Sequence, residues 1–246
     1  MTFPLVEIAT IGVVVPARNE ELRLPRCLAA IAAAGRALRS KDADAPRLRV
    51  VVVADSCTDR TREIADQWTG VEVVVSDAGR VGAARATGIG HLLETEHSAG
   101  TVERRVWIAC TDADSAVPVE WLQLQLHQAR AGIELALGTV APDPQELAAG
   151  ILDAWRLRHL VTDGHPYVHG ANLGIRGDTY RAAGGFQDVA AHEDVLLSVA
   201  VRSAGARVIS SAAGPVLTSG RTRGRAPLGM ATYLRELAGD QLPLQA

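Results

Sequence analysis

The chain has 246 residues, enough for one large domain with a substantial core or for two small ones. Its 48% hydrophobic and 22% charged residues are the usual balance of a globular protein and argue against disorder. With 25 basic and 28 acidic residues the formal charge is −3. The sequence therefore lacks the one-signed field that draws a protein to nucleic acid or anionic lipid, and we expect no nucleic-acid partner.

The spacing of the cysteines and the lengths of the apolar runs indicate the cellular compartment in which the protein is expected. Cys27, Cys57 and Cys110 form no CxxC pair, which argues against a zinc knuckle or a disulfide framework and favours the reducing cytoplasm. The longest apolar runs, such as residues 12–17 and 50–54, are far shorter than the roughly 20 residues that cross a bilayer. The first residues also lack the pattern of a secretory signal. We therefore expect a cytoplasmic protein without a transmembrane span.

Short hydrophobic runs alternate with stretches of helical spacing through the first half of the chain. The runs are rich in β-branched residues and continuous in hydrophobicity, as is typical of strands buried on both faces. We expect strands over residues 11–15, 49–53, 71–75 and 105–109, and helices over residues 20–38, 58–68, 81–94 and 118–131. This alternation predicts βαβ units in a mostly parallel sheet, which binds its ligands at the carboxyl ends of the strands.

The second half of the chain is less regular. We expect strands over residues 134–140, 173–176 and 207–210, helices over residues 144–160, 178–183 and 193–203, and a loop over residues 163–172. Glycine, arginine and proline then dominate the composition. This change predicts a mobile loop over residues 214–227, followed by a last helix over residues 228–237.

Polar residues follow the first two expected strands. In residues 15–20, backbone amides at a helix start would attract an anion or a ring carbonyl, and Glu20 suits a ribose or a base edge. Alternatively, Asn19 is a helix cap and Glu20 a favourable first-turn acid. Asp55 leaves the second strand at its carboxyl end, where an open α/β sheet meets its ligand, whereas Asp59 or Thr58 is expected to cap the next helix.

Two further groups of acids could carry chemistry. Asp112 and Asp114 are two residues apart at the end of the fourth strand, so both can bind one hard cation, with water and diphosphate oxygens completing its coordination. Acids are also common in turns and at helix starts, so an Asp-x-Asp triplet alone is weak evidence for a metal site. Glu193 and Asp194 open a helix. They either complement the helix dipole or supply a general base that takes a proton from an attacking hydroxyl.

Taken together, these segments resemble family 2 glycosyltransferases of the GT-A fold. The resemblance covers about residues 12–208 and rests on seven motifs, at residues 15–20, 54–59, 79–85, 111–115, 170–176, 184–186 and 192–194. It implies a single α/β domain over residues 1–246, with a Rossmann-like, mixed and mostly parallel sheet flanked by helices. Residues 12–115 would form the nucleotide-sugar half and residues 116–213 the acceptor half, followed by the loop and helix of residues 214–246.

The resemblance also implies an activity, the transfer of a sugar from a nucleoside diphosphate, UDP before GDP, to an acceptor hydroxyl. In that family pattern Ala17 and Glu20 would hold the nucleoside and Asp55 the base. Arg80 or Arg85 would contact the base or the diphosphate. The substrate-binding residues that we expect are Pro16, Ala17, Arg18, Glu20, Asp55, Arg80, Arg85, Asp112, Ala113, His169, Gly170 and Asn172.

The same resemblance assigns the metal and the base. Asp112 would face the ribose and the metal shell, and Asp114 would ligate Mn²⁺ or Mg²⁺ directly. Asp194, with Glu193 beside it, would deprotonate the acceptor hydroxyl. Attack from the face opposite the leaving group would invert the anomeric centre.

Two departures from the family pattern narrow these expectations. The Gln-x-x-Arg-Trp element of polysaccharide synthases is absent, so we expect a non-processive enzyme with a small-molecule or glycolipid-type acceptor, and peripheral membrane association stays open. No histidine follows His192, which leaves the third protein ligand of the metal open. A cluster of three arginines lies in the expected loop, namely Arg221, Arg223 and Arg225. The cluster forms either a lid over an anion or part of a solvated loop, and the sequence leaves both interpretations open.

Two other functions are compatible with this class of sheet. A non-catalytic nucleotide-sugar-binding module would use the same pocket without turnover. A sugar-nucleotide pyrophosphorylase needs a glycine-rich loop with arginine and lysine after its first strand, and residues 17–26 contain neither glycine nor lysine.

Overall fold

A computed structural model describes residues 6–147, 150–159, 161–222, 224 and 229–239. Its strands are β1 (Thr10–Ala17), β2 (Arg47–Asp55), β3 (Val71–Ser76), β4 (Val106–Cys110), β5 (Leu135–Pro142), β6 (Leu173–Arg176) and β7 (Val208–Thr218). They form one seven-stranded sheet of order β3-β2-β1-β4-β6-β5-β7. β6 runs antiparallel to its neighbours β4 and β5, and the other neighbouring strands are parallel.

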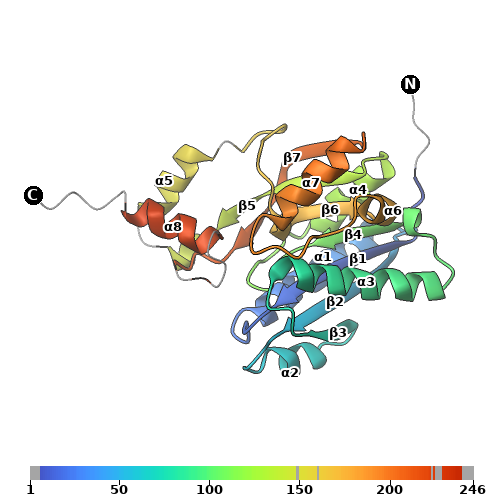
Figure 1. Cartoon of the computed structure of the whole chain (residues 1–246), viewed down its shortest axis with the longest axis horizontal. Helices are drawn as coiled ribbons and strands as arrows, with labels where there is room; N and C mark the ends of the chain where they lie inside the picture. Colours follow the sequence, from blue (N-terminus) through green and yellow to red (C-terminus); the bar gives the residue numbers. More distant parts are fainter. Residues whose placement is uncertain (1–5, 148–149, 160, 223, 225–228, 240–246) are drawn as a thin grey trace, which may run out of the picture.

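Helices cover both faces of this sheet (Figure 1). They are α1 (Leu24–Lys41), α2 (Thr61–Asp66), α3 (Val81–Ser98), α4 (Trp121–Arg130), α5 (Ile151–Arg158), α6 (Gly177–Ala182), α7 (Glu193–Ser203) and α8 (Met230–Gly239). Short 3₁₀ turns lie at Glu103–Arg105, Pro144–Glu146 and Gly170–Asn172. The expected class, a mixed and mostly parallel α/β sheet between helices, is confirmed.

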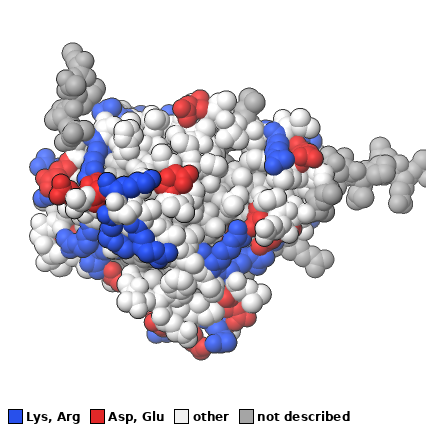
Figure 2. Space-filling view, turned by 180° about the vertical axis from the view of Figure 1, so that it is seen from behind, with Lys and Arg blue, Asp and Glu red and all other residues white. Residues whose placement is uncertain are grey.

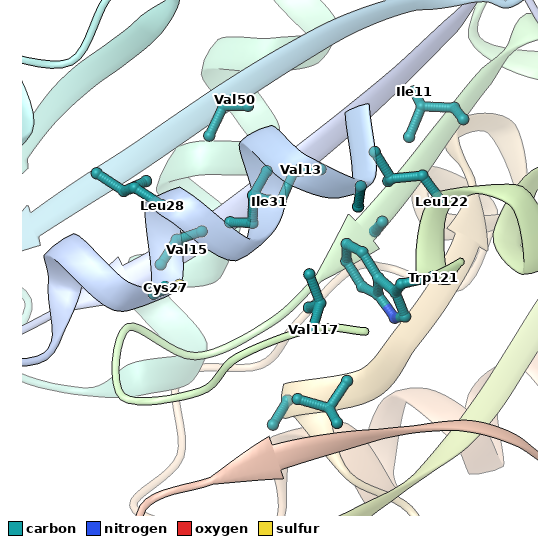
Figure 3. Close-up of a cluster of buried hydrophobic side chains, with 14 of the residues drawn as sticks. Ile11, Val13, Val15, Cys27, Leu28, Ile31, Val50, Val117, Trp121 and Leu122 are labelled. Atoms are coloured by element: carbon teal, nitrogen blue, oxygen red, sulfur yellow. The ribbon is translucent and has the colours of Figure 1, made fainter. Parts of the chain in front are cut away.

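Successive residues of the central strand β1 pack against opposite layers. Val13 and Val15 belong to a buried cluster with α1 and α4, while Val14 packs with α3 and α7 on the other face. Figure 3 shows part of the first cluster, in which Ile31 of α1 lies near Val13 and Val15 of β1, and Trp121 of α4 lies near Val117. Because side chains of a strand alternate between faces, a strand buried on both sides must be apolar throughout, which is the pattern seen in the sequence.

The loops after β1 and β2 are tied together at one edge of the sheet. The side-chain oxygen of Asn19 accepts a hydrogen bond from the backbone N–H of Thr58 at 2.7 Å, and the Glu20 N–H donates to the Thr61 hydroxyl at 2.7 Å. Asn19 therefore links two loops and does not cap α1, which begins later than expected, at Leu24. Asp59 is structural as expected, since it accepts from the Thr61 N–H at the start of α2.

The expected mobile loop over residues 214–227 is wrong in its first part. β7 extends to Thr218 and pairs with β5, with Val216 beside Val140 and Thr218 beside Pro142. The strand passes a register shift near Gly214, where φ is +68°. Glycine and proline suggest a loop locally, but residues 216–218 pair with β5. Between the two paired stretches, Asp163 accepts from the Ala212 N–H and the Asn172 amide donates to the Gly214 carbonyl. Residues 223 and 225–228 lie outside the described residues.

The expected helix over residues 144–160 is also wrong in its first half. A 3₁₀ turn at Pro144–Glu146 comes first, in which the Asp143 carboxylate accepts from the Gln145 N–H at 2.9 Å. Gly150 then takes φ +88°, and α5 begins only at Ile151. Together α5 and α8 form a small separate hydrophobic cluster beside the sheet (Figure 1).

Asn172, expected to bind substrate, is instead part of the framework. Its side chain is 3% exposed. The side-chain oxygen accepts from the Trp121 indole N–H at 2.9 Å, and the amide donates to the carbonyls of Thr139 and Gly214 at 2.8 and 3.2 Å. One buried amide thus joins α4, β5 and β7, because each of its polar atoms needs a partner away from water.

Uncharged residues make up most of the face seen in Figure 2, and the groups of basic and acidic residues on it lie next to one another in several places. Within the described part of the chain, none of the helices combines the length and the apolarity needed to traverse a lipid bilayer.

We predict that Asn172→Ala destabilises the fold without acting on ligand binding. The change leaves the buried Trp121 N–H and two carbonyls unpaired, at a cost of about 1–3 kcal/mol. For a chain of this size the melting temperature should fall by roughly 3–10 °C. The exposed amide of Gln67 provides the control, since Gln67→Ala should change stability by less than about 0.5 kcal/mol. Equal melting temperatures for the two variants would contradict this role.

Candidate active site

A cavity of about 720 Å³ opens at the carboxyl edge of β1, β2 and β4. Because β2 and β4 flank β1 in the sheet, the carboxyl ends of these three strands lie side by side there. Such a place is typical of ligand sites in open α/β sheets. The cavity is lined by all but one of the residues that the sequence predicts: Pro16, Ala17, Arg18, Glu20, Asp55, Arg80, Arg85, Asp112, Ala113, Asp114, His169, Gly170, Glu193 and Asp194. Asn172, described above, is the exception.

One end of the cavity combines a buried acid with exposed arginines. Asp55 is 3% exposed and accepts a hydrogen bond from the Gly79 N–H at 3.1 Å. Arg18 donates to the Gly79 carbonyl at 3.2 Å, and Arg80 pairs with Asp188 at 2.9 Å. This end therefore offers a fixed acceptor, Asp55, beside solvent-facing cationic side chains.

Asp112 and Asp114 follow β4 and form the acidic floor of the cavity. The Asp114 side chain is 14% exposed. Burial, and next the negative charge of Asp112, raise the pKa of Asp114 to about 6. The negative charges of Asp112 and Asp114 repel each other, because burial keeps water from screening them. The pair therefore favours a bound cation.

The residues present fit a divalent cation in the chemistry of their donors. Carboxylate oxygens are the ligands that Mg²⁺ and Mn²⁺ prefer, and burial, followed by the charge of Asp112, raises the pKa of Asp114, so that a cation there would stabilise its charged form. Within the described residues, no group of three or more His, Cys, Asp or Glu side chains is arranged as a metal site. A cation would therefore be held by two aspartates together with oxygens from substrate and water.

Arg85 connects the acidic floor to the opposite wall. Its two terminal nitrogens contact Asp112 at 2.6 Å and Glu193 at 2.5 Å, and its side chain is 3% exposed. These carboxylates raise the pKa of Arg85 above its usual value although burial opposes this. A Cβ on Gly170 would lie 2.5 Å from the guanidinium, and one on Gly82 would lie 2.8 Å from the Glu193 side chain. The two glycines therefore provide the space for the pair.

Asp194 lies at the start of α7, beside Glu193. One of its carboxylate oxygens accepts from the Gly170 N–H at 2.7 Å and the other from the Val195 N–H at 2.8 Å. The residue before this helix start, His192, has φ +63°, a backbone conformation that is uncommon outside glycine and often found at functional sites. These contacts hold the Asp194 carboxylate in one orientation at the cavity wall.

His169 lies next to the Gly170 amide that holds Asp194. Burial lowers the pKa of His169 to about 4, so the ring is neutral at physiological pH. A neutral imidazole can accept or donate a hydrogen bond without adding charge to the cavity.

The sequence did not single out several residues that line the cavity. Among them are His159 and Tyr233, and His159 is stacked on Trp155 at a ring-centroid distance of 4.2 Å. The unusual density of histidine and tyrosine from residue 159 to residue 169 could have signalled this wall.

Arg221 resolves part of the question about the arginine cluster. It lies inside the cavity and contacts Glu20 and Asp114, each at 2.8 Å, so it is not a solvated loop residue. Arg223 and Arg225 lie outside the described residues.

Solved structures with a similar fold share little sequence with the chain. S. aureus TarS (residues 1–349) in complex with UDP-GlcNAc is 15% identical with a TM-score of 0.61, over 94% of this chain and 66% of that one. The mannosyltransferase PcManGT from Pyrobaculum calidifontis, in complex with GDP-Man and Mn²⁺, is 21% identical with a TM-score of 0.58, over 87% and 58%. GalNAc-T7 with UDP, GalNAc and Mn²⁺ is 14% identical with a TM-score of 0.60, over 93% and 48%.

The chain thus spans about half to two thirds of the length of these three structures, and at such identities the likeness concerns the fold. No curated protein matches it in sequence. The family model described as glycosyl transferase family 2 matches residues 12–161, which include the strand ends, both aspartates of the floor and Arg85. The chain therefore belongs to glycosyl transferase family 2.

Proposed function

We propose that this protein transfers a sugar from a nucleoside diphosphate, UDP in preference to GDP, to the hydroxyl of an acceptor, with inversion at the anomeric carbon. The observation that carries the proposal is that one cavity joins the acidic floor, Asp112 and Asp114, to the carboxylate of Asp194. Membership of the family and the UDP or GDP-Man bound by proteins of similar fold support a nucleotide-sugar donor.

The donor is held at the strand ends. Asp55 is buried and fixed by the Gly79 N–H, so its carboxylate can accept hydrogen bonds from the base. Glu20, 6% exposed, can accept from a hydroxyl or a ring N–H of the nucleoside. Arg18 and Arg80 supply charge-assisted donors for the anionic part of the donor.

Asp114 and Asp112 are the residues that would hold a divalent cation. When bound, such an ion stabilises the negative charge that develops on a departing diphosphate. Arg85 acts through these acids, since it orients Asp112 and Glu193 and keeps their mutual repulsion low. We regard Arg85 as a positioning residue.

Asp194 is the proposed general base. As the acceptor oxygen bonds to the anomeric carbon, the bond from that carbon to the diphosphate oxygen breaks and the hydroxyl proton passes to Asp194. Two backbone N–H groups hold the carboxylate ready for this step. His169 and Tyr233 line the acceptor side, where a small-molecule or glycolipid-type acceptor would lie and receive a single sugar.

The proposal is tested by incubating the protein with UDP-sugars and GDP-sugars, with Mn²⁺ or EDTA, and measuring the release of UDP or GDP in the presence of an acceptor panel. We expect Mn²⁺-dependent release from a UDP-sugar and, by NMR, a product of inverted configuration. Donor binding without turnover on any acceptor would indicate a binding module. Release of nucleotide from GDP-sugars alone would overturn the choice of uridine as the nucleoside of the donor.

We predict that Asp194→Asn lowers kcat by about 10²–10⁴-fold, the usual contribution of a general base, with little change in the affinity for UDP. The asparagine oxygen can still accept from the Gly170 N–H, but the amide cannot take the acceptor proton. Asp153→Asn is the matched control, because Asp153 is an exposed residue of α5 that pairs with Arg156. Unchanged turnover in Asp194→Asn would exclude its role as the base.

We predict that Asp114→Asn raises the stability of the metal-free protein at pH 7.5. A folded-state pKa of about 6 lies above the usual 3.8, so the folded chain binds the Asp114 proton more tightly than the unfolded chain does. The charged side chain therefore destabilises the fold above pH 6, by at most about 3 kcal/mol. This cost declines as the pH falls through 6 towards 3.8.

Thermal unfolding with and without Mn²⁺ and UDP checks this prediction. The variant should melt at or above the wild-type temperature and gain no stabilisation from the two ligands together. Asp143→Asn provides the opposite sign, because the pKa of Asp143 is lowered by the hydrogen bonds that it accepts from Gln145 and Arg26, despite the opposing effect of burial, and it should melt lower. A large loss of stability in Asp114→Asn would contradict the argument.

A further inference from the structure

Arg221 occupies the side of the acidic floor that Arg85 leaves open. One terminal nitrogen contacts Glu20 and the other contacts Asp114, each at 2.8 Å. The side chains of both acids are largely buried, at 5% and 14% exposure, and that of Arg221 is 24% exposed. A single guanidinium thus balances two carboxylates that the proposed function uses for the nucleoside and the cation.

The backbone that carries Arg221 is held in place. Glu146 accepts from the Ser219 hydroxyl at 2.5 Å and from the Gly220 N–H at 3.1 Å, and the Arg221 N–H donates to the Ser219 hydroxyl at 3.2 Å. A Cβ on Gly220 would lie 2.9 Å from the Asp143 carbonyl. Arg221 therefore enters the cavity from a fixed point just beyond β7.

A divalent cation on Asp114 and the present position of Arg221 oppose each other. The ion would need the Asp114 oxygen that Arg221 contacts or would lie next to a like charge, and in a poorly hydrated site that repulsion is strong. Binding of the ion alone would break at least the ion pair to Asp114 and leave the guanidinium without that partner. The anionic oxygens of a diphosphate would supply a new one, since arginine binds phosphate in paired hydrogen bonds.

We propose that Arg221 is an exchangeable counter-ion of the metal site, which pairs with Asp114 until cation and nucleotide bind together and then moves to the diphosphate. This inference rests on the proposed function, because it requires a cation on Asp114. It makes the binding of metal and nucleotide cooperative: each strengthens the other by the same factor.

Comparison with Arg85 shows why Arg221 is the exchangeable one. Both bridge two carboxylates, but the Arg85 side chain is 3% exposed and Gly82 and Gly170 fit closely around its ion pair with Glu193. Arg221 is 24% exposed and enters from the end of a strand. Moving Arg85 would leave buried charges unpaired, whereas Arg221 can change partner within the cavity.

The experiment measures Mn²⁺ binding to the full chain by the EPR signal of unbound Mn²⁺, with and without UDP and after allowing for MnUDP in solution. The proteins are wild type, Arg221→Met and Arg62→Met. Arg62 is a matched control because it pairs with Asp66 on α2 and does not line the cavity. Arg221→Lys, which keeps one charge, should give intermediate values, and thermal unfolding verifies that each variant is folded.

We expect Arg221→Met to bind Mn²⁺ alone about 10-fold or more tightly than wild type, the change that corresponds to losing one competing charged hydrogen bond. UDP should strengthen Mn²⁺ binding much less in this variant than in wild type and in Arg62→Met. If wild type binds Mn²⁺ and UDP cooperatively while Arg221→Met binds Mn²⁺ alone no more tightly, the counter-ion role is wrong. If wild type binds neither ligand, the proposed function itself fails.

Discussion

The site depends on the balance of negative charge at one edge of the sheet. Parallel strands bring their carboxyl ends together there, and the loops after them carry acids that include Glu20, Asp112 and Asp114. Carboxylates gathered in one cavity repel one another, and the negative charge of Asp112 adds to the effect of burial in raising the pKa of Asp114. Two arginines, Arg85 and Arg221, hold this cluster together by each pairing with two acids.

The two arginines have different roles: Arg85 is structural, and Arg221 takes part in the proposed exchange of ligands. Arg85 is buried and joins Asp112 of the acidic floor to Glu193 of the wall that carries the proposed general base. It therefore fixes the positions of these two parts of the site relative to each other. Arg221 remains accessible to the cavity. Burial, and next the negative charge of Asp112, raise the pKa of Asp114 although the charge of Arg221 opposes this. A buried carboxylate of this kind costs stability when it is charged and favours a cationic ligand, a common compromise at functional sites.

Small residues around the arginines are as necessary as the charged ones. Gly82 and Gly170 come from segments far apart in the chain, yet each leaves space for one side of the Arg85–Glu193 pair. Any side chain at Gly170 would collide with the guanidinium. Gly82 leaves space for Glu193 and Gly170 leaves space for Arg85, so the glycine of one motif provides the space that a charged residue of another motif needs.

The sequence alone determined the class of sheet, the strand ends and the acids that follow them, because hydrophobic runs and turn residues are local signals. It could not determine the length of β7, which continues beyond its Gly-Pro segment because residues 216–218 pair with β5, nor the buried framework role of Asn172. The contact of Arg221 with Glu20 joins residues 201 positions apart. Only the tertiary structure decides such contacts, because they depend on how strands and loops that are distant in the chain come together in space.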